Sequence, residues 1–335
     1  MELSIAALGD LVRNAEILFM KGLDSVTMVA RNSGMFRIDD ISDHKGNTKE
    51  YSEIDLEEYA DVKLEGDQAS RARVQQGYSK VGTLYRVSKD IGITYEMRHY
   101  NKYIDVISRL TNLGALAGKR MELDLQLRIT FATATSYTSK EGLTIDTTVG
   151  DTLALASTVH TVRGSSTTFR NRLANNPLFS RGSLEGMEQM VIENSINQFG
   201  EKVTIPYDII WTTEDANTVN TVREYLKSTA SPDALNSGVV NVYSGKYKHV
   251  ILPRVAVTSA GANDATKAKY WGLASTMNSQ AFLGINEEAH MKEMNATGAN
   301  LEFSTEDLNL GCAAGYFIVI PGARWFTIST GDAVA

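Results

Sequence analysis

The chain has 335 residues and a mass of 36.7 kDa, which exceeds one average domain and predicts one large domain or two intimately connected ones. Hydrophobic residues make up 43% and charged residues 22%, an ordinary globular composition that excludes a wholly disordered or fibrous chain. The net charge of -7 opposes adsorption onto nucleic acid, and the single cysteine, Cys312, excludes an intrachain disulfide.

The first 95 residues divide into an arm and a long excursion. In residues 1 to 30, apolar side chains recur at helical spacing, which predicts a short helix or an adaptable arm, and charged residues among the first 20 leave no visible export signal. Residues 38 to 76 are acidic and poor in aromatics, whereas residues 79 to 95 are rich in β-branched and aromatic residues. Residues 38 to 95 therefore predict a two-stranded excursion with an acidic, solvated tip. Such a hairpin is marginal alone and needs a partner surface.

A proline-free segment from 97 to 131 carries apolar residues along one helical stripe. It predicts a helix of about 35 residues, roughly 50 Å long. Residues 121 to 131 also alternate strictly between apolar and polar, a pattern that fits a strand equally well. The chain has no run of about 18 uncharged apolar residues, so no membrane-spanning helix is predicted.

The rest of the chain mixes short helices and strands. Residues 132 to 182 predict loops and short strands, followed by a helix that Ser183 caps and that extends through Gln198. Further expected elements are a strand at 202–211, a helix that begins after 212–215, strands at 239–243 and 247–257 with a turn at 244–246, short apolar pieces at 270–275, 281–283 and 301–303, and two strands of one sheet at 315–321 and 323–328.

The residues that could carry chemistry form no recognised motif. Gly245 and Lys246 lack the glycine and hydroxyl spacing of a phosphate-binding loop, and Ser183 lacks the glycine spacing of a hydrolase elbow. The histidines are scattered singly, and the acidic residues 39 to 67 lack the spacing of a calcium loop. Cys312 is interpreted as a buried thiol. The sequence predicts no catalytic residue, cofactor or metal site; a hydrolase that uses Ser183 or Cys312 is the enzymatic alternative.

Three stretches carry a family resemblance: Lys89-Asp-Ile-Gly-Ile-Thr-Tyr-Glu-Met, Asn112-Leu-Gly-Ala-Leu-Ala-Gly-Lys-Arg, and Ser165-Ser-Thr-Thr-Phe-Arg-Asn-Arg-Leu-Ala-Asn-Asn-Pro-Leu-Phe-Ser-Arg-Gly-Ser-Leu-Glu. With the order of arm, excursion and long helix, they resemble the Hong Kong 97-type major capsid proteins of tailed bacteriophages. The third stretch is most similar to the head subunits of Mu-like prophages. The resemblance implies an α+β fold with an N-terminal arm, an extended E-loop hairpin, a long spine helix, and intertwined peripheral and axial domains. It also favours helix over strand at residues 121 to 131.

The resemblance implies a division of the chain into five parts. These are the N-terminal arm at 1–37, the E-loop at 38–95, the peripheral domain with the spine helix at 96–150, a mainly axial domain with peripheral segments at 151–290, and C-terminal peripheral-domain strands at 291–335. Because only about 35 residues precede the E-loop, we expect no cleaved scaffolding segment or a separate scaffold protein.

The implied function is that of a major capsid (head) protein that self-assembles into an icosahedral shell around double-stranded DNA. The expected partners are other copies of the chain, in hexamers and pentamers, with scaffold, portal and decoration proteins as further partners. DNA would be enclosed without sequence recognition, and no membrane partner is expected. The expected location is the virion capsid, after assembly in the host bacterial cytoplasm. An encapsulin-like nanocompartment shell is the alternative.

Oppositely charged surfaces on consecutive elements suit subunit pairing, and ordinary surface charge is the alternative interpretation. The inter-subunit contact residues predicted from them are Glu53, Asp55, Glu57, Glu58, Arg86, Lys89 and Arg98.

Overall fold

The computed structural model describes residues 5–94, 96, 100, 103–165, 167–230, 240–293 and 308–332, and it confirms the predicted α+β class. The helices are α1 (Ile5–Asp24), α2 (Val29–Asn32), α4 (Tyr103–Thr130), α5 (Arg181–Asn194) and α6 (Ala216–Lys227), and η2 (Ala265–Lys267) is a 3-10 helix. Across the described ranges, none of the helices combines the length and the apolar character that a membrane crossing requires.

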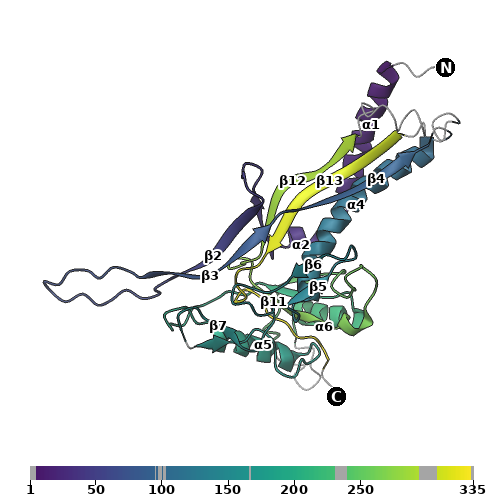
Figure 1. The fold of residues 1–335 in the computed structure, drawn as a ribbon. Helices are drawn as coiled ribbons and strands as arrows, with labels where there is room; N and C mark the ends of the chain where they lie inside the picture. The colour runs from purple at the N-terminus through teal and green to yellow at the C-terminus, as the bar shows by residue number, and fades with distance from the viewer. Residues whose placement is uncertain are drawn as a thin grey trace.

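A four-stranded sheet beside α1 and α4 forms one half of the molecule (Figure 1). Its order is β1 (Arg37–Asp40), β12 (Phe282–Glu293), β13 (Leu308–Val319) and β4 (Tyr85–Ile93). Strand β1 runs parallel to β12, and the other neighbours are antiparallel. The late strand β13 therefore lies inside the sheet, between two strands that precede it in sequence.

The other half of the molecule surrounds a three-stranded sheet. This sheet has the order β10 (Lys248–Ile251), β9 (Ile209–Thr212) and β11 (Trp271–Ala274), with β10 parallel to β9. The two-stranded pairs are β2 (Thr48–Leu56) with β3 (Val74–Thr83), β5 (Ser136–Thr138) with β6 (Thr144–Asp146), and β7 (His160–Thr161) with β8 (Thr168–Phe169). One apolar cluster contains Phe19 of α1, Leu283 of β12 and Trp211 of β9, so the two halves share a continuous core.

The N-terminal segment is a helix docked closely on the long helix. A Cβ atom on Gly114 of α4 would lie 2.0 Å from the carbonyl oxygen of Phe19, and one on Gly22 of α1 would lie 1.9 Å from that of Thr111. Only glycine permits backbones to approach so closely. The prediction of a helix within residues 1 to 30 is confirmed for Ile5–Asp24.

The long helix predicted at 97 to 131 is confirmed as α4, from Tyr103 to Thr130. The start of the prediction, residues 97–99, 101 and 102, lies outside the described residues. The alternating tail is helical although its pattern also fits a strand. Its polar side chains are buried together with its apolar ones, so alternation there does not separate a core face from a solvent face.

The buried polar residues of α4 hold distant segments in place. Glu122, Gln126 and Thr130 lie one helical turn apart on one face. Glu122 accepts a hydrogen bond from the backbone amide of Ala30 at 2.7 Å, and Gln126 accepts one from that of Arg254 at 2.6 Å. Since buried polar groups must be hydrogen-bonded, this face requires partners from segments that precede and follow α4 by many residues.

The two-stranded excursion is shorter than the predicted range 38–95. Strand β1 pairs with β12 and β4 pairs with β13, so both belong to the four-stranded sheet. Only β2, β3 and the residues between them, 48 to 83, leave the body as a hairpin (Figure 1). The break at Leu84 turns one predicted strand region into two strands of different sheets.

The N-cap of helix α5 lies three residues before the predicted cap at Ser183. The N-cap is Ser180, whose hydroxyl accepts from the amide of Ser183 at 3.2 Å, while the hydroxyl of Ser183 accepts from the amide of Ser180 at 2.8 Å. This reciprocal pair satisfies two free amides at the helix start. The helix ends at Asn194, short of the predicted end at Gln198.

Several short strands also differ from prediction. The strand expected at 202–211 is confined to β9, and the one at 247–257 to β10, which pairs in parallel with β9 instead of forming a hairpin with 239–243. Residues 323–328 form single bridges beside β11 and Arg172 and do not pair with β13. Pieces of this length lack the periodicity that fixes a partner. The predicted piece at 301–303 lies outside the described residues.

Candidate assembly surface

The hairpin of β2 and β3 projects from the junction of the two halves and ends in a long, extended loop (Figure 1). The paired strands reach to Leu56, which lies opposite Val74. Residues 57–73 then continue as two arms without regular pairing to a turn in which the amide of Asp67 donates to the carbonyl of Leu64 at 3.1 Å. Gly66 in this turn has a φ of +88°, a conformation that favours glycine.

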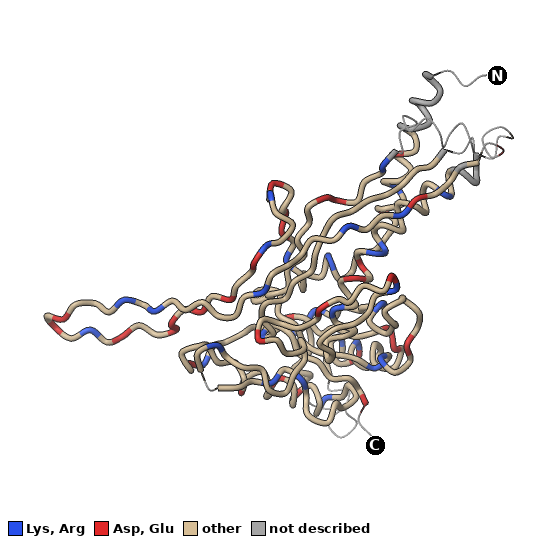
Figure 2. The backbone as a smooth tube through the Cα atoms, viewed as in Figure 1, with Lys and Arg blue, Asp and Glu red and all other residues tan. Residues whose placement is uncertain are grey.

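The tip carries charges of both signs. Figure 2 shows both acidic and basic residues along one arm, and basic residues along the other. The predicted acidic character holds for the outgoing arm, but the returning arm adds Arg71 and Arg73, and Arg73 pairs with Glu57 at 2.7 Å. The tip is solvated as predicted, but it is not uniformly repulsive.

The two faces of the hairpin differ in burial. Toward the body, Tyr51 stacks on Phe282 with ring centroids 4.4 Å apart. On the other face, Ile54, Leu56 and Val74 are 67%, 59% and 64% exposed. Because Leu56 and Val74 are paired and Ile54 is two residues from Leu56, these side chains are neighbours on one uncovered apolar face. The sequence analysis missed this face because it counted the charges of the segment and not its alternation.

Ion pairs anchor the base of the hairpin to the body. Asp55 pairs with Arg324 at 2.9 Å, and Lys80 pairs with Asp146 at 2.9 Å. The guanidinium of Arg163 also donates to the carbonyl of Gly77 at 2.6 Å. These bonds hold both strands, so the hairpin leaves the body in a defined direction.

A buried carboxyl lies under this base. Glu53 is 7% exposed and faces Gly322, where an added Cβ would lie 1.9 Å from its Oε1 and 1.7 Å from Oε1 of Gln280. Burial raises the pKa of Glu53 to about 7, against the opposing effect of the guanidinium of Arg324.

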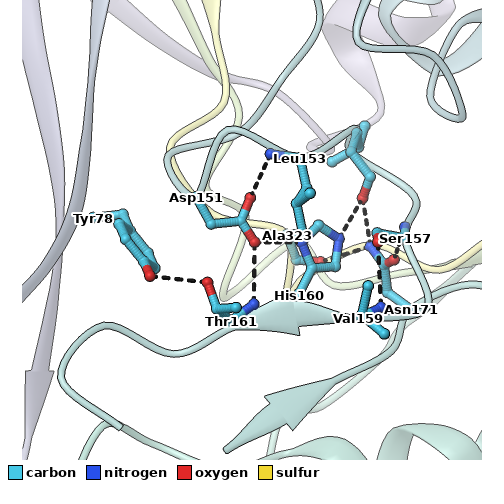
Figure 3. A network of polar contacts seen from close by, with 10 residues as sticks. Tyr78, Asp151, Leu153, Ser157, Val159, His160, Thr161, Asn171 and Ala323 are labelled. Atoms are coloured by element: carbon cyan, nitrogen blue, oxygen red, sulfur yellow. Dashed lines mark hydrogen bonds and ion pairs between the residues drawn. The ribbon is translucent and has the colours of Figure 1, made fainter. Parts of the chain in front are cut away.

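A polar network supports the loop on which the hairpin rests (Figure 3). The imidazole of His160 is fully buried, with Nδ1 2.8 Å from Asp151 Oδ2 and Nε2 3.2 Å from the carbonyl oxygen of Leu155. Burial acts to raise the pKa of Asp151, but the hydrogen bonds from His160 and from the amides of Leu153 and Thr161 together hold it below its ordinary value. Next to this pair, the hydroxyls of Thr161 and Tyr78 lie 2.9 Å apart and join β7 to β3.

The network does not have the arrangement of a hydrolase site. Both ring nitrogens of His160 face oxygen acceptors, so neither accepts a proton from a nucleophile within the described residues. Ser183 is engaged in the helix cap, and burial raises the pKa of the Cys312 thiol, which is 4% exposed. Among the residues that the structure describes, no group of three or more histidine, cysteine or acidic residues is placed to hold a metal ion.

The predicted inter-subunit residues have different surroundings. Glu53 faces its own chain, and Asp55, Glu57 and Arg86 pair within the chain, Arg86 with Glu287 at 3.0 Å. Glu58 and Lys89 are exposed, and Arg98 lies outside the described residues. A contact of these residues with a second subunit stays a prediction, and Glu58 and Lys89 are the two that are free to make it.

A groove of about 410 Å³ runs along the outer edge of β2. Its lining includes consecutive residues of β2, from Ser52 to Leu56, which identifies the strand edge as one wall. Val203, Ile205 and Arg37 line the opposite side. The groove therefore combines apolar side chains with the edge of a strand.

No family model matches the sequence, and no curated protein matches it. Several solved structures do. The capsid of the cyanophage P-SCSP1u covers 88% of this chain and 85% of its own, with 9% identity and a TM-score of 0.49. The match to the virus-like particle from Pyrococcus furiosus covers 94% of this chain and 97% of that chain, with 10% identity and a TM-score of 0.48. The match to Gordonia phage Cozz covers 88% of this chain and 84% of that chain, with 10% identity and a TM-score of 0.48.

The matched regions extend over most of the chain, at 9 to 10% identity. In this chain, the order of a helical arm, a projecting hairpin and a long helix agrees with the capsid-type order that the sequence resemblance implies. The functional proposal therefore depends on this chain's own surfaces.

Proposed function

We propose that the protein is a shell-forming subunit that assembles with copies of itself, and that the hairpin of residues 48 to 83 lies across a neighbouring subunit. The observation that carries the proposal is the uncovered apolar face of Ile54, Leu56 and Val74 on a hairpin anchored at its base. A two-stranded hairpin is marginal in water, and clustered exposed apolar side chains mark interaction surfaces. In this proposal the hairpin takes the role of the E-loop, with narrower bounds than 38–95.

Repetition makes such a contact effective. Ordering the loop of residues 57–73 on a partner costs conformational entropy, so one contact is weak. In a closed shell, every subunit both gives and receives a hairpin, and linked weak contacts act together. Hexamers and pentamers are the capsomers that we propose for this arrangement.

The proposal is tested by shortening the hairpin. The amide of Glu57 donates to the carbonyl of Arg73 at 3.2 Å, so an Asn-Gly turn can replace residues 58–72 between this hydrogen-bonded pair without changing the register of β2 and β3. We expect this variant to fold, with an unchanged melting temperature, and to remain a small species in negative-stain microscopy and light scattering. The matched control is Asp67→Asn, which keeps the loop length and should still assemble. Normal shells from the shortened variant would refute the role of the hairpin.

We also propose that the shell encloses double-stranded DNA. The resemblance to phage head proteins and the net charge of -7, which reduces adhesion to a packaged genome, support this cargo. Particles isolated from cells that carry the native genomic locus should protect DNA from added nuclease. Particles that enclose a protein cargo and no DNA would favour the nanocompartment alternative.

A further inference from the structure

The outer edge of β2 presents free backbone groups to the groove. The amide of Glu57 donates to the carbonyl of Arg73 in the opposite arm, so residue 57 points its backbone toward that arm. By alternation, Ile54 and Leu56 point their backbone groups the other way, into the groove. Part of this edge is occupied by the chain itself, because the carbonyl of Leu56 accepts from the side chain of Asn197 at 3.4 Å and the amide of Glu58 donates to Glu201 at 2.9 Å. The backbone groups of Ile54 and the amide of Leu56 are left without a partner among the described residues. An unpaired strand edge of this kind is a template for another strand.

The groove also contains polar atoms without partners. Arg324 Nε and Gln280 Oε1 are buried and have no hydrogen-bond partner among the described residues. The side chains of both residues line the groove, although these two atoms are covered. Arg37 adds a guanidinium that has no carboxylate partner within the described ranges and bonds only to the carbonyl of Met277.

The outgoing arm of the hairpin has the pattern of a strand that lacks a partner. Ala60, Val62 and Leu64 alternate with Tyr59, Asp61 and Lys63. Val62 is 92% exposed and Leu64 is 68% exposed, although alternation of this kind is typical of a strand with one covered face. The arm is extended and pairs with no strand of its own chain.

We propose that residues 59–64 of one copy add as a strand to the free edge of β2 in a second copy, within the groove. In that position Ala60, Val62 and Leu64 extend the apolar face of Ile54 and Leu56. Asp61 lies on the opposite side, toward the groove wall that holds Arg37, so the charges are complementary. This inference rests on the proposed function and names the receiving surface for the hairpin.

The occupant must come from another copy. Residue 66, at the turn, lies ten residues beyond Leu56, and the arm extends away from the body. At 3.3 Å per residue, an extended arm of this length places the turn about 30 Å from Leu56. The arm of a chain therefore points away from its own groove. A tip that binds the base of the next copy makes a head-to-tail contact, which either closes into a ring or continues without end. Ring closure is the geometry that a hexamer or pentamer requires.

Pairs of introduced cysteines test the inference, because alternate residues of a strand face opposite sides and only one side can cross-link. Ile54→Cys is combined with a second cysteine at each position from 59 to 64 in turn, and assembled particles are oxidised and run on a non-reducing gel. Native Cys312 is buried and single variants give the background. Cross-linking between copies should occur with Ala60→Cys, Val62→Cys or Leu64→Cys. It should be absent with Tyr59→Cys, Asp61→Cys and Lys63→Cys, whose side chains project from the other face of the strand.

The outcomes separate this inference from the proposed function. Assembled particles that give no cross-link at any position, or equal cross-links at all positions, would overturn strand addition and leave the shell proposal standing. If the unmodified chain forms no particles at any concentration, the shell proposal itself fails. Cross-links that form at the even positions from 60 to 64 and not at the odd ones, and that disappear when particles are dissociated before oxidation, establish the strand pairing.

Discussion

Replacing Glu53 with glutamine should remove a pH dependence from the hairpin base. The carboxyl is buried beside Asp55, Asp151 and Arg324, and burial raises its pKa from 4.5 to about 7. Glutamine keeps the shape of the side chain and is neutral at every pH. Glu53→Gln therefore changes the protonation chemistry without emptying the site.

The sign of the effect follows from the raised pKa. In the unfolded chain Glu53 loses its proton near pH 4.5, whereas the folded chain keeps it until about pH 7. The folded state binds the proton more tightly, so the stability present below pH 4.5 is lost as pH rises to about 7 and stays constant above it. A difference of about 2.5 pKa units corresponds to roughly 3 kcal/mol.

Hydrogen exchange at the hairpin base measures this effect where it acts. Amides of β2 and β3 in the native chain should exchange faster at about pH 8 than at about pH 5, after correction for the intrinsic rate. In Glu53→Gln this change should largely disappear. Glu58→Gln is the matched control, because Glu58 is exposed on the same hairpin, and it should behave as the native chain does.

The comparison between variants isolates Glu53 from other buried acids. Burial also raises the pKa of Asp124 and of Glu122, and both contribute to the pH dependence of the whole molecule. Their contribution is the same in both chains and cancels in the difference. The reasoning would be refuted if Glu53→Gln and the native chain kept a constant difference in protection from about pH 5 to about pH 8.

Two further substitutions test packing and anchoring. Gly114→Ala should lower the free energy of unfolding by about 2 kcal/mol or more in a denaturant titration, because its Cβ would lie 2.0 Å from a backbone oxygen of α1. The control is Gly182→Ala in α5, whose Cβ would meet nothing within 4 Å and which should be neutral or stabilising. Equal effects of the two substitutions would contradict the close packing of α1 on α4. Arg324→Ala should leave the mostly buried Asp55 without its ion-pair partner, lower the free energy of unfolding by about 2 kcal/mol and speed amide hydrogen exchange in β2. The control is Arg86→Ala, which removes an exposed ion pair and should leave exchange in β2 unchanged. Normal protection of β2 in the Arg324 variant would show that the pair with Asp55 is not an anchor.

The sequence was most informative where apolar residues keep one spacing over a long stretch. The apolar stripe of α4 and the apolar spacing of α1 predicted both helices. The tail of α4 could not be decided from its pattern, because Glu122 and Gln126 are buried by hydrogen bonds to residues far along the chain. Local periodicity reports burial only where polar residues face water. The resemblance, and not the pattern, favoured helix there.

The sheet partners were less predictable than the strands. β4 and β3 are separated only by Leu84, and nothing in their composition indicates that β4 pairs with the distant β13. In the same way, β10 pairs in parallel with β9 although a turn signal before it favoured a hairpin. The hairpin ion pairs depend on such long-range placement, so single residues could not be assigned as contacts in advance. The alternation of residues 59–64 was readable, but the charge of the segment obscured it.

The anchor of the hairpin comes from the end of the chain. Asp55 is held by Arg324, Glu53 lies over Gly322, and the sheet that carries β4 is completed by β13. During synthesis, the hairpin leaves the ribosome long before any of these residues exists. A growing chain therefore has its projecting strands before it has the residues that fix their base, and the groove beside β2 is incomplete until Arg324 has been made. In the docking that we propose, a nascent chain that has not yet reached Arg324 therefore offers no complete receiving groove to a neighbouring copy.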